Sequence, residues 1–268
     1  MLLRRNFLFM KTIVSIGAFD PTGGAGVLAD IRVAGRFGVY GMSVLTAATS
    51  QNPKSFNGVE AVSDDMFRKQ ISDVFDHYRV DAMKCGMIAT KSQLKILIDF
   101  FSANNPQNLV VDPIISATLG NREFDKETID LYRELCGYAL LVTPNVKETE
   151  ILGEIIKNRH MGNDTQNTNP QYPAILNKGG DANSNICVDI LKIGDEEIKF
   201  TSEKIKTTNT HGTGCTMSSA IASCLAIGYD LKTSVKIAHD YVNRAIAGAV
   251  DLDITEGYGP LNHFVETE

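Results

Sequence analysis

The sequence lacks a basic excess, because 32 aspartates and glutamates outnumber 26 lysines and arginines and leave a net charge of −6. Nucleic-acid binding normally leaves a basic face in such a count. We therefore expect no nucleic-acid partner and favour a small molecule as the substrate or ligand. Apolar runs long enough to span a bilayer are also missing, so we expect no membrane association.

Cysteine pairs are missing as well, since none of the five cysteines stands in a CxxC motif. An odd number of cysteines spread over 268 residues does not indicate a disulfide framework. We therefore expect a reducing, cytoplasmic location. The G-K-[ST] ending of a Walker A loop is also absent, which argues against a P-loop NTPase.

The N-terminus resembles a signal peptide only in its first residues. In MLLRRNFLFMK the apolar residues are interrupted by Arg4 and Arg5, and no small-residue cleavage site follows. We expect residues 1–11 to form an extension, with a translation start at Met10 as the alternative. Residues 12–268 are expected to form a single domain, since a chain of this length can bury one full core.

Apolar runs rich in β-branched residues alternate with amphipathic stretches along the whole chain. Strands are predicted at 12–19, 42–50, 81–87, 108–113, 140–144 and 174–180, with a hairpin over 186–202. Helices are predicted at 27–38, 64–78, 92–101, 125–138, 145–153, 213–227 and 231–249. The first of these helices is expected to bury Leu28, Ile31, Ala34 and Phe37. This alternation is typical of an α/β fold with a mostly parallel sheet covered on both faces.

Polar side chains directly follow several predicted strands. Asp112 follows the strand at 108–113, Asn145 and Glu148 follow the next, and Lys178 follows the run AILN. Ligands of open α/β sheets bind beyond the carboxyl ends of the strands, so these residues are candidates for a metal and polyphosphate site. The structural alternative is that Asp112 caps a turn and that Asn145 and Glu148 form a capping box.

The first glycine turn, DPTGGAG at 20–26, admits two interpretations. GAGVLA matches the loose G-x-G-x-x-A pattern of dinucleotide-binding folds, but the second strand ends in Gln51 rather than in a carboxylate that could hold a ribose. A nicotinamide cofactor is therefore a minor alternative. The structural alternative is a tight turn with close backbone approach.

The segment HGTGC at 211–215 places two glycines immediately before an apolar helix. Unpaired backbone amides and the positive end of the helix dipole meet at such a point, which favours an anion. Cys215 lies in the first turn, where a helix N-terminus lowers the pKa of a thiol and favours a thiolate base. The alternative is that Cys215 is a small buried apolar residue, as Cys224 is expected to be.

Taken together, these segments resemble the hydroxymethylpyrimidine/phosphomethylpyrimidine kinases of thiamin synthesis, in the ribokinase-like superfamily. The matching segments are DPTGGAGVLAD, FGVYGMSVLTAATSQN, KCGMIAT, VVDPIISA, VTPNVKETEIL, NKGGD, NTHGTGCTMSSAIA and GYGPLNHF. The resemblance implies a three-layer αβα sandwich, usually as a homodimer. It also implies transfer of the ATP γ-phosphate to 4-amino-5-hydroxymethyl-2-methylpyrimidine and then a second phosphorylation to the diphosphate, with Mg²⁺.

Carried over position by position, the resemblance also implies roles for individual residues. Cys215 would be the catalytic base, and the amides of Gly212, Thr213 and Gly214 would form the anion hole. The residues serving the nucleotide and Mg²⁺ would be Asp112, Asn145, Glu148 and Lys178, with Asp112 and Glu148 on the metal.

The resemblance places the pyrimidine near Asp30, Gln51, Met87 and Ile114. Gln51 has the donor and acceptor that complement an aminopyrimidine edge. Thr118 stands where many members carry a lysine, which bears on the second phosphorylation, and the segment before Lys178 is short and rich in asparagine. Two alternatives remain open, namely a pyridoxal or pyridoxine kinase of the same superfamily and a pyrimidine-binding protein without turnover.

Overall fold

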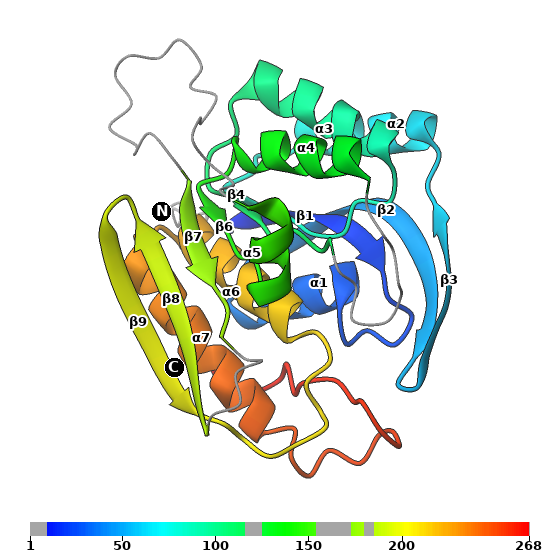
Figure 1. Ribbon diagram of the computed structural model, residues 1–268. Coiled ribbons are helices and arrows are strands. Elements are labelled where there is room, and N and C mark those ends of the chain that lie inside the picture. Colours follow the sequence, from blue (N-terminus) through cyan, green and yellow to red (C-terminus); the bar gives the residue numbers. More distant parts are fainter. Residues whose placement is uncertain (1–9, 116–124, 154–172, 180–184, 268) are drawn as a thin grey trace, which may run out of the picture.

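The computed structural model describes residues 10–115, 125–153, 173–179 and 185–267 and contains a nine-stranded sheet (Figure 1). Its strand order is β3-β2-β1-β4-β5-β6-β7-β8-β9. The six strands from β2 to β7 in this order are parallel, whereas β3, β8 and β9 pair antiparallel at the two ends. The strands are β1 (Thr12–Phe19), β2 (Tyr40–Asn52), β3 (Ser55–Ala61), β4 (Ala82–Cys85), β5 (Leu109–Val111), β6 (Leu141–Val142), β7 (Ala174–Asn177), β8 (Ile186–Ile193) and β9 (Glu196–Glu203).

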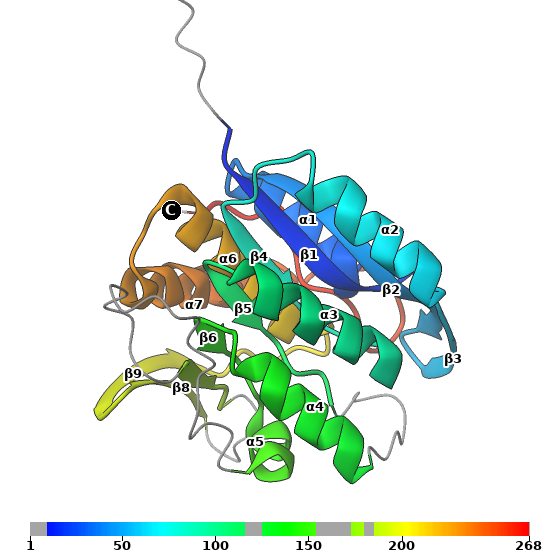
Figure 2. The same cartoon turned by 90° about the horizontal axis from the view of Figure 1, so that it is seen from above.

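Helices cover both faces of this sheet and confirm the three-layer αβα sandwich. One face carries α1 (Gly26–Arg36), α6 (Thr213–Ile227) and α7 (Leu231–Ala247), and the other carries α2 (Asp64–Phe75), α3 (Lys91–Asn104) and α4 (Lys126–Cys136) (Figures 1 and 2). The short helix α5 (Val146–Leu152) packs beside α4. In the described part of the chain, no helix has the length and apolar character needed to cross a membrane.

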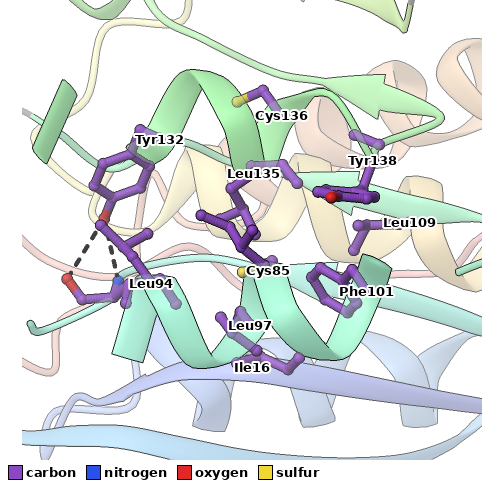
Figure 3. Packing of buried hydrophobic residues seen from close by; sticks show 14 of the residues in the cluster. Ile16, Cys85, Leu94, Leu97, Phe101, Leu109, Tyr132, Leu135, Cys136 and Tyr138 are labelled. Atoms are coloured by element: carbon purple, nitrogen blue, oxygen red, sulfur yellow. Dashed lines mark hydrogen bonds between the residues drawn. The ribbon is translucent and has the colours of Figure 1, made fainter. Parts of the chain in front are cut away.

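The two faces of the sheet enclose two apolar clusters. Figure 3 shows the one beneath α3 and α4, where Leu97 and Phe101 pack against Leu109 of β5. The hydroxyl of Tyr132 lies 3.4 Å from both the amide and the carbonyl of Ile88 and so satisfies its polar group inside this core. Alternate residues of the buried strands point to opposite clusters, which explains why these strands appear in the sequence as continuous apolar runs.

Two predictions differ from the structure. The segment 55–61 forms β3, which pairs antiparallel with the long β2, although its mixed polar sequence predicts no strand. The helix α1 buries Ala34 as expected but leaves Leu28 and Ile31 only half-buried, because it is rotated to place Val27 and Asp30 inward. Thr118, the N-terminal nine residues and most of the asparagine-rich segment lie outside the described residues.

Candidate active site

A cavity of about 330 Å³ lies at the carboxyl ends of the parallel strands. It collects all but one of the residues that the sequence analysis selected, namely Gln51, Met87, Asp112, Ile114, Asn145, Glu148, Lys178, Gly212, Thr213, Gly214 and Cys215. These residues come from segments more than 160 positions apart, and the parallel topology brings them to one edge of the sheet.

Asp30 is the selected residue that the structure does not bring to the cavity wall. Its side chain is completely buried and accepts hydrogen bonds from the hydroxyls of Ser15 and Ser219. It also forms an ion pair with Lys84, in which Oδ2 of Asp30 and Nζ of Lys84 are 2.8 Å apart. The expected contact between Asp30 and a pyrimidine therefore does not fit the position of this carboxylate. Lys84, on β4, lines the cavity instead.

The glycine turn before α6 is held against the first glycine turn of the chain. Gly212 is the N-cap of α6 and has a φ of 87°, and a Cβ at this position would lie 1.8 Å from the carbonyl oxygen of Gly24. The amide of Thr213 already donates to the carbonyl of Thr210 at 3.3 Å. Within the described chain the amides of Gly212, Gly214 and Cys215 have no backbone acceptor, so these three supply free donors at the helix N-terminus.

Gly212→Ala is expected to destabilise the protein by about 2 kcal/mol more than Gly228→Ala. Both glycines have a positive φ at an end of α6, but a Cβ at Gly228 meets no atom within 4 Å. Gly228→Ala therefore introduces backbone strain alone, whereas Gly212→Ala adds a backbone clash of the kind that overpacking produces. Urea unfolding of the two variants measures the difference, and equal losses would contradict this explanation of Gly212.

Cys215 lies in the first turn of α6 and is 6% exposed. Burial raises the pKa of its thiol to about 11, although Lys84 and the backbone amide of Gly26 act in the opposite direction. The expectation of a lowered thiol pKa is therefore wrong. The desolvation of the thiolate outweighs the favourable charge and amide around it.

A lysine–aspartate pair lies beside this helix N-terminus. The Nζ atom of Lys178 is 2.8 Å from Oδ1 of Asp112, which also accepts the hydroxyl of Thr143. Burial alone would raise the pKa of Asp112, but the charges of Lys178 and Lys84 hold it below its ordinary value. A Cβ at Gly214 would lie 3.1 Å from Nζ of Lys178, so the glycine lets this pair approach the helix.

Asn145 and Glu148 form the predicted capping box at the start of α5 and also line the cavity. Each side chain accepts a hydrogen bond from the backbone amide of the other, at 2.9 and 2.8 Å. Burial raises the pKa of Glu148 to about 7, with Lys178 opposing the shift and Asp112 adding to it. Asn145 and Glu148 therefore cap the helix and line the cavity at the same time.

Glu148→Gln is expected to become more stable relative to wild type as the pH rises from 4.5 to 8, by on the order of 2 kcal/mol. Because the folded-state pKa lies above the ordinary value of 4.5, the wild-type protein loses stability as the pH rises through this window. Glutamine keeps the capping-box acceptor but does not ionise. Urea unfolding at several pH values measures this, with the exposed Glu150→Gln on the same helix as control. A pH-independent difference would contradict the raised pKa.

Asp20 and His211 form a contact, and neither residue is among those predicted for the site. Nε2 of His211 lies 2.8 Å from Oδ2 of Asp20, and both residues line the cavity. Burial alone would raise the pKa of Asp20, but the bonds from His211 and Thr22 lower it. This pair connects the two glycine turns. The signal available in the sequence was the position of Asp20 directly after the first strand and of His211 directly before GTGC.

The carboxylates of this site fit the preferences of Mg²⁺. Among the described residues no group of three His, Cys, Asp or Glu side chains could enclose a metal. Mg²⁺ is usually held by one or two carboxylates together with substrate phosphates rather than by a protein cage. Asp112 and Glu148 are two buried carboxylates whose mutual repulsion contributes to the raised pKa of Glu148, and a divalent cation would relieve it.

Comparison with known proteins gives the family. The phosphomethylpyrimidine kinase family model matches residues 20–262. The hydroxymethylpyrimidine/phosphomethylpyrimidine kinase of Rhizobium meliloti is 35% identical over 260 residues, which cover 94% of this chain and 96% of that protein. A probable thiamine biosynthetic bifunctional enzyme of Oryza sativa is also 35% identical, but the chain spans only 47% of its length.

Solved structures show the same fold. An ADP complex of Bacillus subtilis pyridoxal kinase has a TM-score of 0.80 at 29% identity and covers 95% of this chain and 97% of that one. The phosphomethylpyrimidine kinase of Clostridium difficile has a TM-score of 0.69 at 30% identity and covers 87% of this chain and 100% of that one. The chain has the ribokinase-like fold and belongs to the phosphomethylpyrimidine kinase family.

Proposed function

We propose that the protein transfers the γ-phosphoryl group of ATP to the hydroxymethyl group of 4-amino-5-hydroxymethyl-2-methylpyrimidine, and then phosphorylates the monophosphate to the diphosphate. The observation that carries this proposal is the cavity itself. Its wall contains the N-terminus of α6 with Lys178, Asp112 and Glu148, and it also contains Gln51 and Met87. The first group suits a polyphosphate, and the second suits an aminopyrimidine.

The proposed chemistry is an in-line phosphoryl transfer. The hydroxymethyl oxygen forms a bond to the γ-phosphorus while the bond to the β,γ-bridging oxygen breaks, and ADP leaves with that electron pair. The hydroxyl proton passes to Sγ of Cys215, which acts as general base. The free amides of Gly212, Gly214 and Cys215 stabilise the charge on the transferred group, and Lys178 binds the phosphates. Asp112 and Glu148 would hold Mg²⁺, which would neutralise part of the charge on the phosphates.

Gln51 is the residue that we propose to recognise the aminopyrimidine ring of the substrate. Its Nε2 atom donates to the hydroxyl of Thr49 at 3.0 Å, which fixes the amide plane at the cavity wall. An amide held in this way offers a donor and an acceptor to the amino group and ring nitrogen of an aminopyrimidine. The proposed assembly, from the family resemblance, is a homodimer.

A second candidate activity is phosphorylation of pyridoxal. The observation that favours it is the TM-score of 0.80 with a pyridoxal kinase, above the 0.69 with a phosphomethylpyrimidine kinase. The chemistry at Cys215 would be the same and only the ring would change.

We expect purified protein with Mg·ATP to convert the hydroxymethylpyrimidine to its phosphate at least tenfold faster, by kcat/KM, than it converts pyridoxal. Mass spectrometry of the products and coupled detection of ADP measure both rates, and a diphosphate product would establish the second step. A higher kcat/KM for pyridoxal would assign the chain to the second activity. Absence of ADP with either substrate would leave a binding protein without turnover.

A further inference from the structure

A buried ion pair joins Lys84 of β4, which lines the cavity, to Asp30 of α1, which does not. Lys84 is 1% exposed and Asp30 is 0% exposed, and Nζ and Oδ2 are 2.8 Å apart. Asp30 also accepts hydrogen bonds from Ser15 and Ser219, so both its oxygens are occupied. The aspartate is therefore fixed from three elements, and the lysine ammonium is fixed by the aspartate.

The same network holds the helix that carries Cys215. Ser219 follows Cys215 by one turn of α6, and its hydroxyl donates to Asp30. Lys84 lines the same cavity as Cys215, and α6 packs against β4. A Cβ at Gly86 would lie 2.8 Å from Nζ of Lys84, so the glycine leaves room for the ammonium at the end of the strand. One fixed positive charge therefore lies in the wall of the cavity that Cys215 also lines.

Stability alone does not account for a buried pair at this position. Desolvation of two ions costs about as much as their attraction returns, and well-packed apolar residues of similar volume often do as well or better. Among the described residues the Lys84 ammonium donates to Asp30 alone, and an ammonium group has three donors. Its position beside the proposed base suggests a use in the reaction.

We propose that Lys84 is a positioning residue for the reaction, whose ammonium, fixed by Asp30, offsets the negative charge that Cys215 carries as thiolate. The proposal rests on the proposed function in taking Cys215 as the base. In this proposal the buried Asp30 is the counter-ion that keeps Lys84 in place and charged.

The effects of the neighbouring charges on the pKa of Cys215 are consistent with stabilisation of the thiolate by Lys84. Burial opposes the thiolate most strongly, Lys84 is the strongest favourable charge, and Asp30 and Asp112 oppose it more weakly. Lys178 faces the same thiol from the end of β7. Loss of Lys84 is therefore expected to raise the pKa of Cys215, and simultaneous loss of Asp30 should recover only a part of the change.

The test is the rate of Cys215 alkylation by iodoacetamide between pH 7 and 10, followed by mass spectrometry of the Cys215 peptide. We expect Lys84→Met to slow the reaction at pH 8 at least tenfold, because only the thiolate reacts. The double variant Lys84→Met with Asp30→Asn, which leaves no unpaired buried charge, should slow it at least threefold. Cys187, which is partly exposed, serves as the internal reference in every sample.

The surface double variant Lys236→Met with Asp240→Asn is the matched control and should react like wild type, because this pair is exposed. A folded Lys84/Asp30 double variant that alkylates Cys215 at the wild-type rate would overturn the proposal and leave a structural role. This readout does not depend on kinase turnover. A shifted alkylation profile in a protein that phosphorylates neither substrate would therefore support the role of Lys84 while contradicting the proposed function.

Discussion

Cys215→Ala is expected to lower kcat for pyrimidine phosphorylation by about 10²- to 10⁴-fold, the range typical for loss of a general base. The KM for ATP should change little, because Lys178, Asp112 and the amides of α6 remain in place. The matched control is Cys224→Ala, since Cys224 is buried about two and a half turns further along the same helix and is not among the residues that line the cavity. It should keep wild-type kcat. Steady-state kinetics of the two variants, with unfolding curves for both, separate catalysis from packing.

The pH dependence of the wild-type enzyme gives a second measure of the same role. Because burial raises the pKa of Cys215 to about 11, the reactive thiolate is the minor form at neutral pH. Its fraction, and with it kcat/KM, should rise about tenfold per pH unit between pH 7 and 9. The residual activity of Cys215→Ala should show no such slope. A wild-type profile that is flat over this range, or a variant with normal kcat, would show that Cys215 is a packing residue.

The part of the site that could be predicted from the sequence is the part that local rules determine. Asp112, Glu148 and Lys178 each follow a strand, and parallel strands end at one edge of a sheet, so their meeting in one cavity follows from position along the chain. The strands themselves are apolar runs between glycine turns. The hairpin of β8 and β9 alternates along its length and was predicted for the same reason.

What could not be predicted depends on partners far away in the sequence. Asp30 lies on a helix whose apolar spacing favours burial of Leu28 and Ile31. Its inward position is explained by partners far along the chain, namely Lys84, 54 positions away, and the hydroxyls of Ser15 and Ser219. The pKa of Cys215 follows from its burial in α6, which packs against β1 and β4, whereas the sequence shows only the helix N-terminus. The strand β3 exists because β2 is long enough to pair with it.

Asp30→Asn is expected to destabilise the protein by about 3–5 kcal/mol, the cost of leaving one partner of a buried ion pair uncompensated. Asparagine has nearly the same shape, so the cost arises from Lys84, whose amino group is left at 1% exposure without the Asp30 counter-ion. The control Asp65→Asn breaks the exposed pair with Lys69 and should change stability little, because water already solvates both groups. Urea unfolding at pH 7.5 compares the two variants.

The double variant Asp30→Asn with Lys84→Met decides whether this loss is due to charge. If the uncompensated ammonium causes it, removing the ammonium restores most of the lost stability, and the two substitutions are far from additive. If instead the hydrogen bonds from Ser15 and Ser219 hold α1 and α6 together, the double variant stays as unstable as Asp30→Asn. Recovered stability combined with a poorly reactive Cys215 would mean that the buried pair serves the reaction and that the fold can do without it.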